Sequence, residues 1–282
     1  MIAQQFDYSA PKTLEEALGL LADGAKPLAG GMSLIPMMKL RLANPERVVD
    51  LGRLKDLNYI RDDGGNLHVG ATTTHFDVES STVVQSKCPL LAQTASCIGD
   101  VQVRNTGTIG GSVAHADPSA DYPAALQALE AKVVLQSSKG QRTVAIDDFL
   151  VDTFTTSIEP DEIIREVIVP VDGSHVNYEK MAQIASGFAV VGVAVRIQRA
   201  AGKVTMARIG VTGLSNRAYR AKAAEKALEG TSGSAADVQT AAALVDQGVE
   251  ANGDLHASAD FRRHLARVYA ARSLGAALAR NA

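Results

Sequence analysis

The apolar positions in the first 55 residues alternate between strand-like and helix-like spacing. Residues 14–21 place their apolar side chains on one helical face, and Thr13 stands where a helix N-cap is expected. Residues 25–29 have the pattern of a short strand that runs directly into a glycine pair. A second short helix is expected after Ser33, and a further strand at 47–51. This pattern predicts a small βαβ unit with a glycine-rich turn after its first strand.

The next stretch, residues 56–172, mixes short strands with helices. Turn residues separate strand-like pieces at 59–61, 67–70 and 72–74, and a helical pattern from 78 to 98 is broken by Pro89. Val101 to Gly111 contains many turn residues and is predicted to be a loop. The remaining expectations are a helix at 120–129, a hairpin at 132–146 and a strand at 162–169.

A polar turn at 171–174 is the predicted boundary to a third part. Beyond it the pattern predicts three long antiparallel strands at 176–184, 189–198 and 204–213, followed by helices at 220–228, 235–248 and 260–280. The chain is therefore expected to be an α+β protein. Its predicted domains are an N-terminal α/β part at 1–55, a second α+β part at 56–172, and a C-terminal sheet with helices at 173–282.

Composition narrows the possible functions. A net charge of −3 without a long basic run argues against a nucleic-acid partner. No apolar stretch reaches the roughly 18 residues of a membrane span. The first residues lack the features of a signal peptide, and Cys88 and Cys97 do not have metal-ligand spacing. We therefore expect a cytoplasmic protein without a transmembrane segment and without a metal site in this chain.

Two glycine-rich segments, about eighty residues apart, carry the candidate chemistry. They are Ala29-Gly30-Gly31-Met32-Ser33 and Thr108-Ile109-Gly110-Gly111-Ser112. A glycine pair lets the backbone approach a ligand, and consecutive N–H groups beside a hydroxyl form a concavity suited to phosphate oxygens. Two such segments can hold the two phosphates of a dinucleotide. Each segment taken alone is also compatible with a tight turn, and neither matches a GxGxxG or Walker motif.

The polar residues after the second segment allow two interpretations. Asp117 and Asp121 can accept hydrogen bonds from ribose or ribityl hydroxyls, but Asp117 followed by Pro118 is equally suited to capping the next helix. His115 has neither a nucleophile elbow nor a carboxylate pair beside it, and is more consistent with a structural or ligand-contacting role. No catalytic residue is assigned.

Together these residues resemble a known family. The motifs AGGMSLIPMMKLRLANP and QVRNTGTIGGSVAHADPSADYP look like those of the FAD-binding medium subunits of molybdenum hydroxylases. That family includes medium chains of carbon monoxide dehydrogenase, quinoline- and nicotine-type dehydrogenases, and the flavin domain of xanthine dehydrogenase. The resemblance covers essentially the whole chain. It implies a PCMH-type, vanillyl-alcohol-oxidase-like FAD-binding domain in two α/β parts, with a C-terminal domain of antiparallel strands and helices.

The resemblance also implies roles for individual residues. The first glycine segment is expected to hold one side of the FAD pyrophosphate and the second the other side. Asp121 would contact the sugar-alcohol chain of the flavin, Lys26 would lie near the adenine end, and Phe188 stands where relatives place a Tyr near the isoalloxazine ring. At two places the sequence differs from the pattern of this family.

The first is Met32, where relatives often have His or Gln. The second is Ser186-Gly187-Phe188-Ala189, which replaces a Gly-Asp-Tyr-Ala pattern of the carbon monoxide dehydrogenase type and weakens carbon monoxide as the substrate.

The implied function is electron transfer within a heteromeric enzyme. A large partner subunit would oxidise the substrate at a molybdenum–molybdopterin cytosine dinucleotide centre, and a small partner would pass electrons through [2Fe–2S] clusters to FAD in this chain. The implied assembly is a dimer of heterotrimers. N-heterocycles, aldehydes and carbon monoxide remain open as substrates, and NAD, oxygen, a quinone or another carrier as acceptors. The alternatives are a stand-alone FAD-dependent oxidoreductase and a non-enzymatic nucleotide-binding or assembly module.

Overall fold

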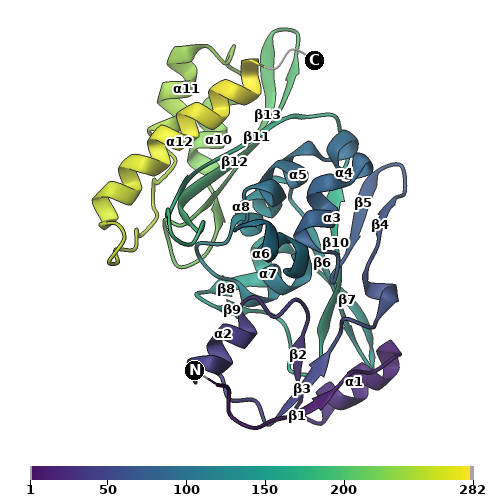
Figure 1. Ribbon diagram of the computed structural model, residues 1–282. Helices are drawn as coiled ribbons and strands as arrows, with labels where there is room; N and C mark the ends of the chain where they lie inside the picture. Colours follow the sequence, from purple (N-terminus) through teal and green to yellow (C-terminus); the bar gives the residue numbers. More distant parts are fainter. Residues whose placement is uncertain (1, 280–282) are drawn as a thin grey trace.

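Three main β-sheets follow one another along the chain (Figure 1). The computed structural model describes residues 2–279. The first sheet is parallel, with strand order β1-β3-β2, and the second has five strands in the order β4-β5-β10-β6-β7. The third has four strands in the order β11-β12-β13-β14. This arrangement confirms the predicted α+β class.

The N-terminal unit is a parallel βαβ arrangement, as predicted. It consists of β1 (Asp7–Ser9), α1 (Leu14–Ala22), β2 (Lys26–Leu28), α2 (Leu34–Lys39) and β3 (Arg47–Asp50). The Thr13 hydroxyl caps α1 by accepting a hydrogen bond from the Glu16 N–H at 3.2 Å. The apolar face of α1 packs on β3 through Leu18, Leu21 and Val49. The short edge strand β1 was not predicted.

The second sheet is antiparallel and supports a layer of helices. Its strands are β4 (Ile60–Asp62), β5 (Asn66–Gly70), β6 (Lys132–Ser137), β7 (Gly140–Ala145) and β10 (Ile163–Pro170). The helices are α3 (His75–Ser80), α4 (Thr82–Lys87), α5 (Pro89–Ser96), α6 (Val101–Thr106), α7 (Ile109–His115) and α8 (Asp121–Ala128). Three short elements complete this part: the 3₁₀ turn η1 (Lys55–Leu57), α9 (Ile146–Phe149), and the hairpin of β8 (Leu150–Asp152) with β9 (Thr155–Thr156).

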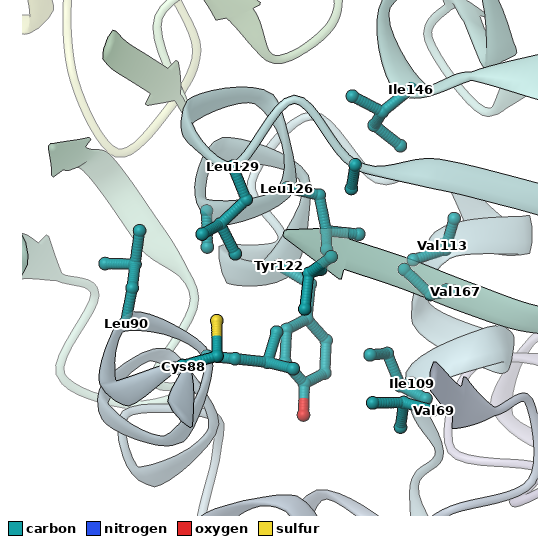
Figure 2. Packing of buried hydrophobic residues seen from close by; sticks show 14 of the residues in the cluster. Val69, Cys88, Leu90, Ile109, Val113, Tyr122, Leu126, Leu129, Ile146 and Val167 are labelled. Carbon is teal, nitrogen blue, oxygen red and sulfur yellow. The ribbon is translucent and has the colours of Figure 1, made fainter. Parts of the chain in front are cut away.

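The largest hydrophobic core fills the space between this sheet and the helices. Figure 2 shows Tyr122 and Leu126 of α8 facing Val167 of β10 and Val113 of α7. All four side chains are fully buried. This core holds the N-terminal end of α7, and with it the second glycine segment, against the five-stranded sheet.

Two predictions in this part were wrong. Residues 101–111 do not form a loop, because α6 and α7 occupy most of that stretch. Each helix has a side-chain N-cap: Asp100 accepts from the Val103 N–H at 2.8 Å, and Thr108 accepts from the Gly111 N–H at 3.1 Å. Residues 72–74 form a turn rather than a strand, apart from a single bridge between Thr74 and Thr108.

The C-terminal part is the predicted antiparallel meander with helices. Its strands are β11 (His175–Ala182), β12 (Ala189–Ala200), β13 (Lys203–Thr212) and β14 (Tyr219–Arg220). The helices are α10 (Lys222–Leu228), α11 (Ala235–Ala242) and α12 (Ala259–Ala279). One face of the sheet packs on these helices and the other on α8, so most of β12 is buried on both faces. Among residues 2–279, no helix has the length and apolarity that crossing a membrane requires.

Candidate cofactor-binding site

The two glycine segments, far apart in sequence, contact each other in the structure. Gly30 lies directly on the backbone between α6 and α7: a Cβ at this position would collide with the Thr106 carbonyl oxygen and lie 2.8 Å from the Gly107 Cα. On the neighbouring face, a Cβ built on Gly111 would lie 3.9 Å from the Cβ of Ala29. The absence of a side chain at Gly30 is therefore what allows the two segments to approach.

The first segment presents a run of backbone donors without protein partners. None of the N–H groups of residues 29–33 donates a hydrogen bond to another described residue. Gly31 has a φ of +72°, in the left-handed region that glycine adopts without strain. Ser33 occupies the N-cap position of α2, yet its side chain makes no capping hydrogen bond. Five successive free N–H groups beside a free hydroxyl form the donor set that a phosphate requires.

The second segment contributes differently. Its backbone donors are already used: Ile109 N–H donates to the Thr73 carbonyl at 3.1 Å and Gly110 N–H to the Ala71 carbonyl at 2.9 Å. The Gly111 N–H goes to its own cap, Thr108. A Cβ on Gly110 would lie 2.5 Å from the Ala71 Cβ, so this glycine serves packing against the sheet.

The second segment therefore offers a ligand only the surface at Gly111, which carries no side chain, and the hydroxyl of Ser112. Gly111 has no side chain on the face next to Ala29. The Ser112 hydroxyl, half-buried one residue further along α7, makes no hydrogen bond to another described residue.

Lys26 and His115 lie close together at one end of this region. Lys26 is exposed on β2, and its charge is near enough to His115 to influence the imidazole. Burial lowers the pKa of His115, and the Lys26 ammonium acts in the same direction while Asp117 opposes it. The His115 ring packs on Phe154 with 4.9 Å between ring centroids. Because β2 ends at Leu28, the Lys26 ammonium lies on the strand that leads into the first glycine segment.

Asp121 is buried, with only 4% of its surface exposed. Its carboxylate accepts hydrogen bonds from the Tyr178 hydroxyl at 2.5 Å and from the Lys180 ammonium at 3.0 Å. Burial raises the pKa of Asp121, and Lys180 and Tyr178 oppose that rise. Both partners come from β11, which places Asp121 at the junction between α8 and the C-terminal sheet.

Sequence reasoning missed Tyr178 and Lys180 as parts of this site. A signal was present: Val176, Tyr178 and Lys180 alternate on one face of a predicted strand, and a lysine on a buried face requires a charged partner. The Lys180 ammonium also donates to the Cys97 carbonyl at 2.7 Å and to the Gly187 carbonyl at 2.6 Å. All three of its protons are thus used, and none remains for another ligand.

Lys180 thereby fixes the turn that carries Phe188. This turn joins β11 to β12, and Gly187 has a φ of +75° within it. The Gln183 N–H donates to the Phe188 carbonyl at 2.8 Å, and the Ala189 N–H donates to the Ser119 carbonyl at 3.1 Å. Phe188 remains 45% exposed. Its ring is therefore available to pack on a ligand.

The fold and the glycine segments define a class of protein. The parallel βαβ unit with free amides, the helical layer behind it and the covering meander are those of a flavin-binding dehydrogenase component. The chain belongs to the FAD-binding family of the molybdopterin dehydrogenases, whose model matches residues 4–172. Residues 176–277 match the CO dehydrogenase flavoprotein C-terminal domain.

Similar proteins agree with this family over the full length of the chain. The chain is 40% identical to the carbon monoxide dehydrogenase medium chain of Hydrogenophaga pseudoflava, covering 99% of both chains. Its structure resembles a chain of that organism's carbon monoxide dehydrogenase with a TM-score of 0.97, 42% identity and full coverage of both chains. Quinoline 2-oxidoreductase from Pseudomonas putida 86 follows with a TM-score of 0.94 and 34% identity, over 99% of this chain and 98% of that chain.

Proposed function

We propose that this chain is the FAD-carrying electron-transfer subunit of a heteromeric molybdenum hydroxylase. In this role it receives electrons from [2Fe–2S] clusters in a small partner subunit and passes them through FAD to an external acceptor. Substrate oxidation takes place at a molybdenum centre in a large partner subunit. The observation that carries the proposal is the run of unpartnered N–H groups at residues 29–33, placed against a Cβ-free surface at Gly111.

The residues present fit FAD. The N–H groups of Ala29, Gly30, Gly31, Met32 and Ser33 would donate to the pyrophosphate, and Lys26 would lie near its adenine end. The second segment, Thr108 to Ser112, would form the opposite wall through Gly111 and Ser112, with the Ser112 hydroxyl as its donor. Ile109 and Gly110 would support this wall from the buried side. Because Met32 contributes through its backbone, the absence of the His or Gln found in relatives does not remove a phosphate donor.

The flavin end is assigned to the junction with the C-terminal sheet. Phe188 would pack beside the isoalloxazine ring through its exposed face. Asp121 is held by Tyr178 and Lys180, so it would act on the sugar-alcohol chain from a fixed position. FAD supplies the redox chemistry, accepting and releasing electrons, while this chain binds and orients it. No side chain of this chain is needed as a catalytic acid or base.

The domain division at 55 and 172 is part of the same proposal. Residues 1–55 would supply the phosphate donors, 56–172 the opposite wall, and 173–282 the cover carrying Phe188. The proposed assembly, a dimer of heterotrimers in the cytoplasm, rests on the resemblance to medium chains rather than on any contact within this chain.

The test is the visible absorbance spectrum of the native complex and of the chain alone after reconstitution with FAD. We expect flavin bands in both samples, and iron–sulfur absorbance and molybdenum only where the partner subunits co-purify. A chain that binds no FAD under any reconstitution condition would refute the proposal. Substrate-dependent flavin reduction by the isolated chain would instead identify a stand-alone oxidoreductase.

A further inference from the structure

Helix α6 lies beside the proposed FAD site but is not anchored by the hydrophobic core. None of its residues is buried, and the Val101 side chain is 57% exposed. Its last residue nevertheless belongs to the surface on which the first glycine segment rests, because a Cβ on Gly30 would collide with the Thr106 carbonyl oxygen. Polar contacts must therefore hold this helix in place.

Arg104 of α6 makes such a contact to the neighbouring helix α3. Its side chain is 18% exposed, and its Nε donates to Glu79 Oε2 on α3 at 2.8 Å. A hydrogen bond between two charged groups is stronger than one between neutral groups. The two segments also share a backbone bond, since the His75 N–H donates to the Gly107 carbonyl at 2.9 Å. The Arg104–Glu79 pair thus adds a charged anchor to an otherwise exposed helix.

A second nitrogen of Arg104 holds the segment that follows α5. Nη1 donates to the carbonyls of Ile98 at 3.2 Å and Gly99 at 3.3 Å. The backbone of Gly99 in turn contacts the turn that carries Phe188, because a Cβ on Gly187 would lie 3.3 Å from the Gly99 Cα. The guanidinium therefore supports, through one backbone contact, the aromatic residue assigned to the flavin end.

Lys180 holds the same segment from the C-terminal sheet. Its ammonium donates to the Cys97 carbonyl at 2.7 Å and to the Gly187 carbonyl at 2.6 Å. The three successive carbonyls of residues 97–99 thus all accept hydrogen bonds from cationic side chains. Without Arg104, this stretch would keep its connections to α5 and to Lys180 but lose the one to α6.

We propose that Arg104 is a positioning residue that fixes the pyrophosphate end and the flavin end of the FAD site relative to each other. Its pair with Glu79 holds α6, on which the first glycine segment rests. Its bonds to Ile98 and Gly99 hold the turn of Phe188. Because the guanidinium is planar and rigid, the two sets of acceptors are held at a fixed separation. This inference rests on the proposed function, since it requires FAD to span both ends.

The test uses the whole chain and two readouts, one for each end of the site. ADP carries a pyrophosphate but no flavin, so its binding to the FAD-free chain, measured by calorimetry, reports on the pyrophosphate end. The visible circular dichroism of the FAD-saturated chain reports on the surroundings of the isoalloxazine ring. Arg104→Met removes every donor of this side chain, and Glu79→Gln weakens the pair while keeping an acceptor. Arg267→Met is the matched control, since it breaks an ion pair of similar length, 2.9 Å to Asp246, on α12.

We expect Arg104→Met to raise the dissociation constants of ADP and FAD by at least about tenfold, equivalent to 1.4 kcal/mol. The visible circular dichroism of the bound flavin should change even when FAD is saturating. Glu79→Gln should change both readouts in the same direction by less. Arg267→Met should lower Tm yet leave ADP affinity and the flavin signal at wild-type values.

A lower Tm in Arg104→Met with unchanged ADP affinity and flavin circular dichroism would mean that the residue only stabilises the fold, and would overturn the inference. A change at one end alone would also overturn it, because the proposal requires both ends to respond. If Arg104→Met does not fold, Glu79→Gln decides by the same criteria. A wild-type chain that binds neither FAD nor ADP would instead refute the proposed function.

Discussion

Replacing Gly30 by Ala is expected to separate the two glycine segments and so weaken FAD binding. The new Cβ collides with the Thr106 carbonyl oxygen and lies 2.8 Å from the Gly107 Cα. Both are backbone atoms, so no side-chain rotation relieves the contact. Overpacking of this kind costs about 1–3 kcal/mol of folding free energy. In domains of about 150–250 residues, each kcal/mol corresponds to roughly 2–4 °C in Tm.

The expected effect on FAD affinity is larger than the effect on stability. If the displacement breaks two hydrogen bonds to the charged pyrophosphate, the loss is about 3–6 kcal/mol at roughly 1.5–3 kcal/mol each. This corresponds to at least about a hundredfold rise in the dissociation constant. The assay is a flavin fluorescence titration of the apoprotein, with thermal unfolding of the same apoprotein measured in parallel.

Gly275→Ala is the matched control for this substitution. Gly275 lies within α12, and no atom lies within 4 Å of a Cβ built there. Alanine in a helix interior is about 0.5–1 kcal/mol more favourable than glycine, so this variant should be slightly more stable and bind FAD normally. A Gly30→Ala protein with wild-type FAD affinity would refute the assignment of residues 29–33 to the pyrophosphate.

Three further substitutions have expected outcomes. Lys180→Met leaves the Asp121 carboxylate buried without its cation and should cost about 3–5 kcal/mol near pH 7 in urea unfolding. Because burial raises the folded-state pKa of Asp121, this cost should shrink as the pH falls toward about 4, and a pH-independent cost would contradict the argument. Burial, aided by the Arg104 charge, lowers the pKa of His75 to about 4. The neutral imidazole therefore contributes up to about 3 kcal/mol to the free energy of unfolding, and this contribution is lost as the pH falls from about 6.5 to 4. His75→Phe should therefore reduce the drop in Tm between pH 7 and pH 5, and an unchanged drop would exclude this role. Met32→Ala should leave the free energy of FAD binding within about 0.5 kcal/mol of wild type, whereas a loss beyond 1.4 kcal/mol would mean that the side chain contributes.

The long elements of the fold were predictable because their signals are local. The meander of β11, β12 and β13 follows from runs of apolar residues separated by turn residues, and α1 from its apolar face and its Thr13 cap. The errors have a physical cause. In residues 101–111, Gly, Asn and Thr favour turns, but the Asp100 and Thr108 caps and the packing of Ile109 and Val113 in the core stabilise two helices instead. The strand β1 spans only three residues and is a strand because it pairs with β3.

The glycine segments could be found in the sequence, but their separate contributions could not. Which N–H groups remain free depends on partners distant in sequence: Ala71 and Thr73 take the donors of Gly110 and Ile109, while residues 29–33 find none. The same limit applies to Lys180. Its position on a strand was predictable, but its three acceptors come from α8, from the residue after α5 and from the turn before β12.

The contact between the C-terminal sheet and the rest of the chain depends on hydrogen bonds as well as apolar packing. The Thr212 hydroxyl is bonded to the carbonyls of Pro118 at 2.7 Å and Ala120 at 2.8 Å, and the Gly213 N–H donates to Pro118 at 2.7 Å. Apolar contacts alone would tolerate a small slide of the sheet, whereas these directional bonds do not. Since the turn that carries Phe188 is tied to the same short segment through Ser119, its distance from the glycine segments is fixed by the fold.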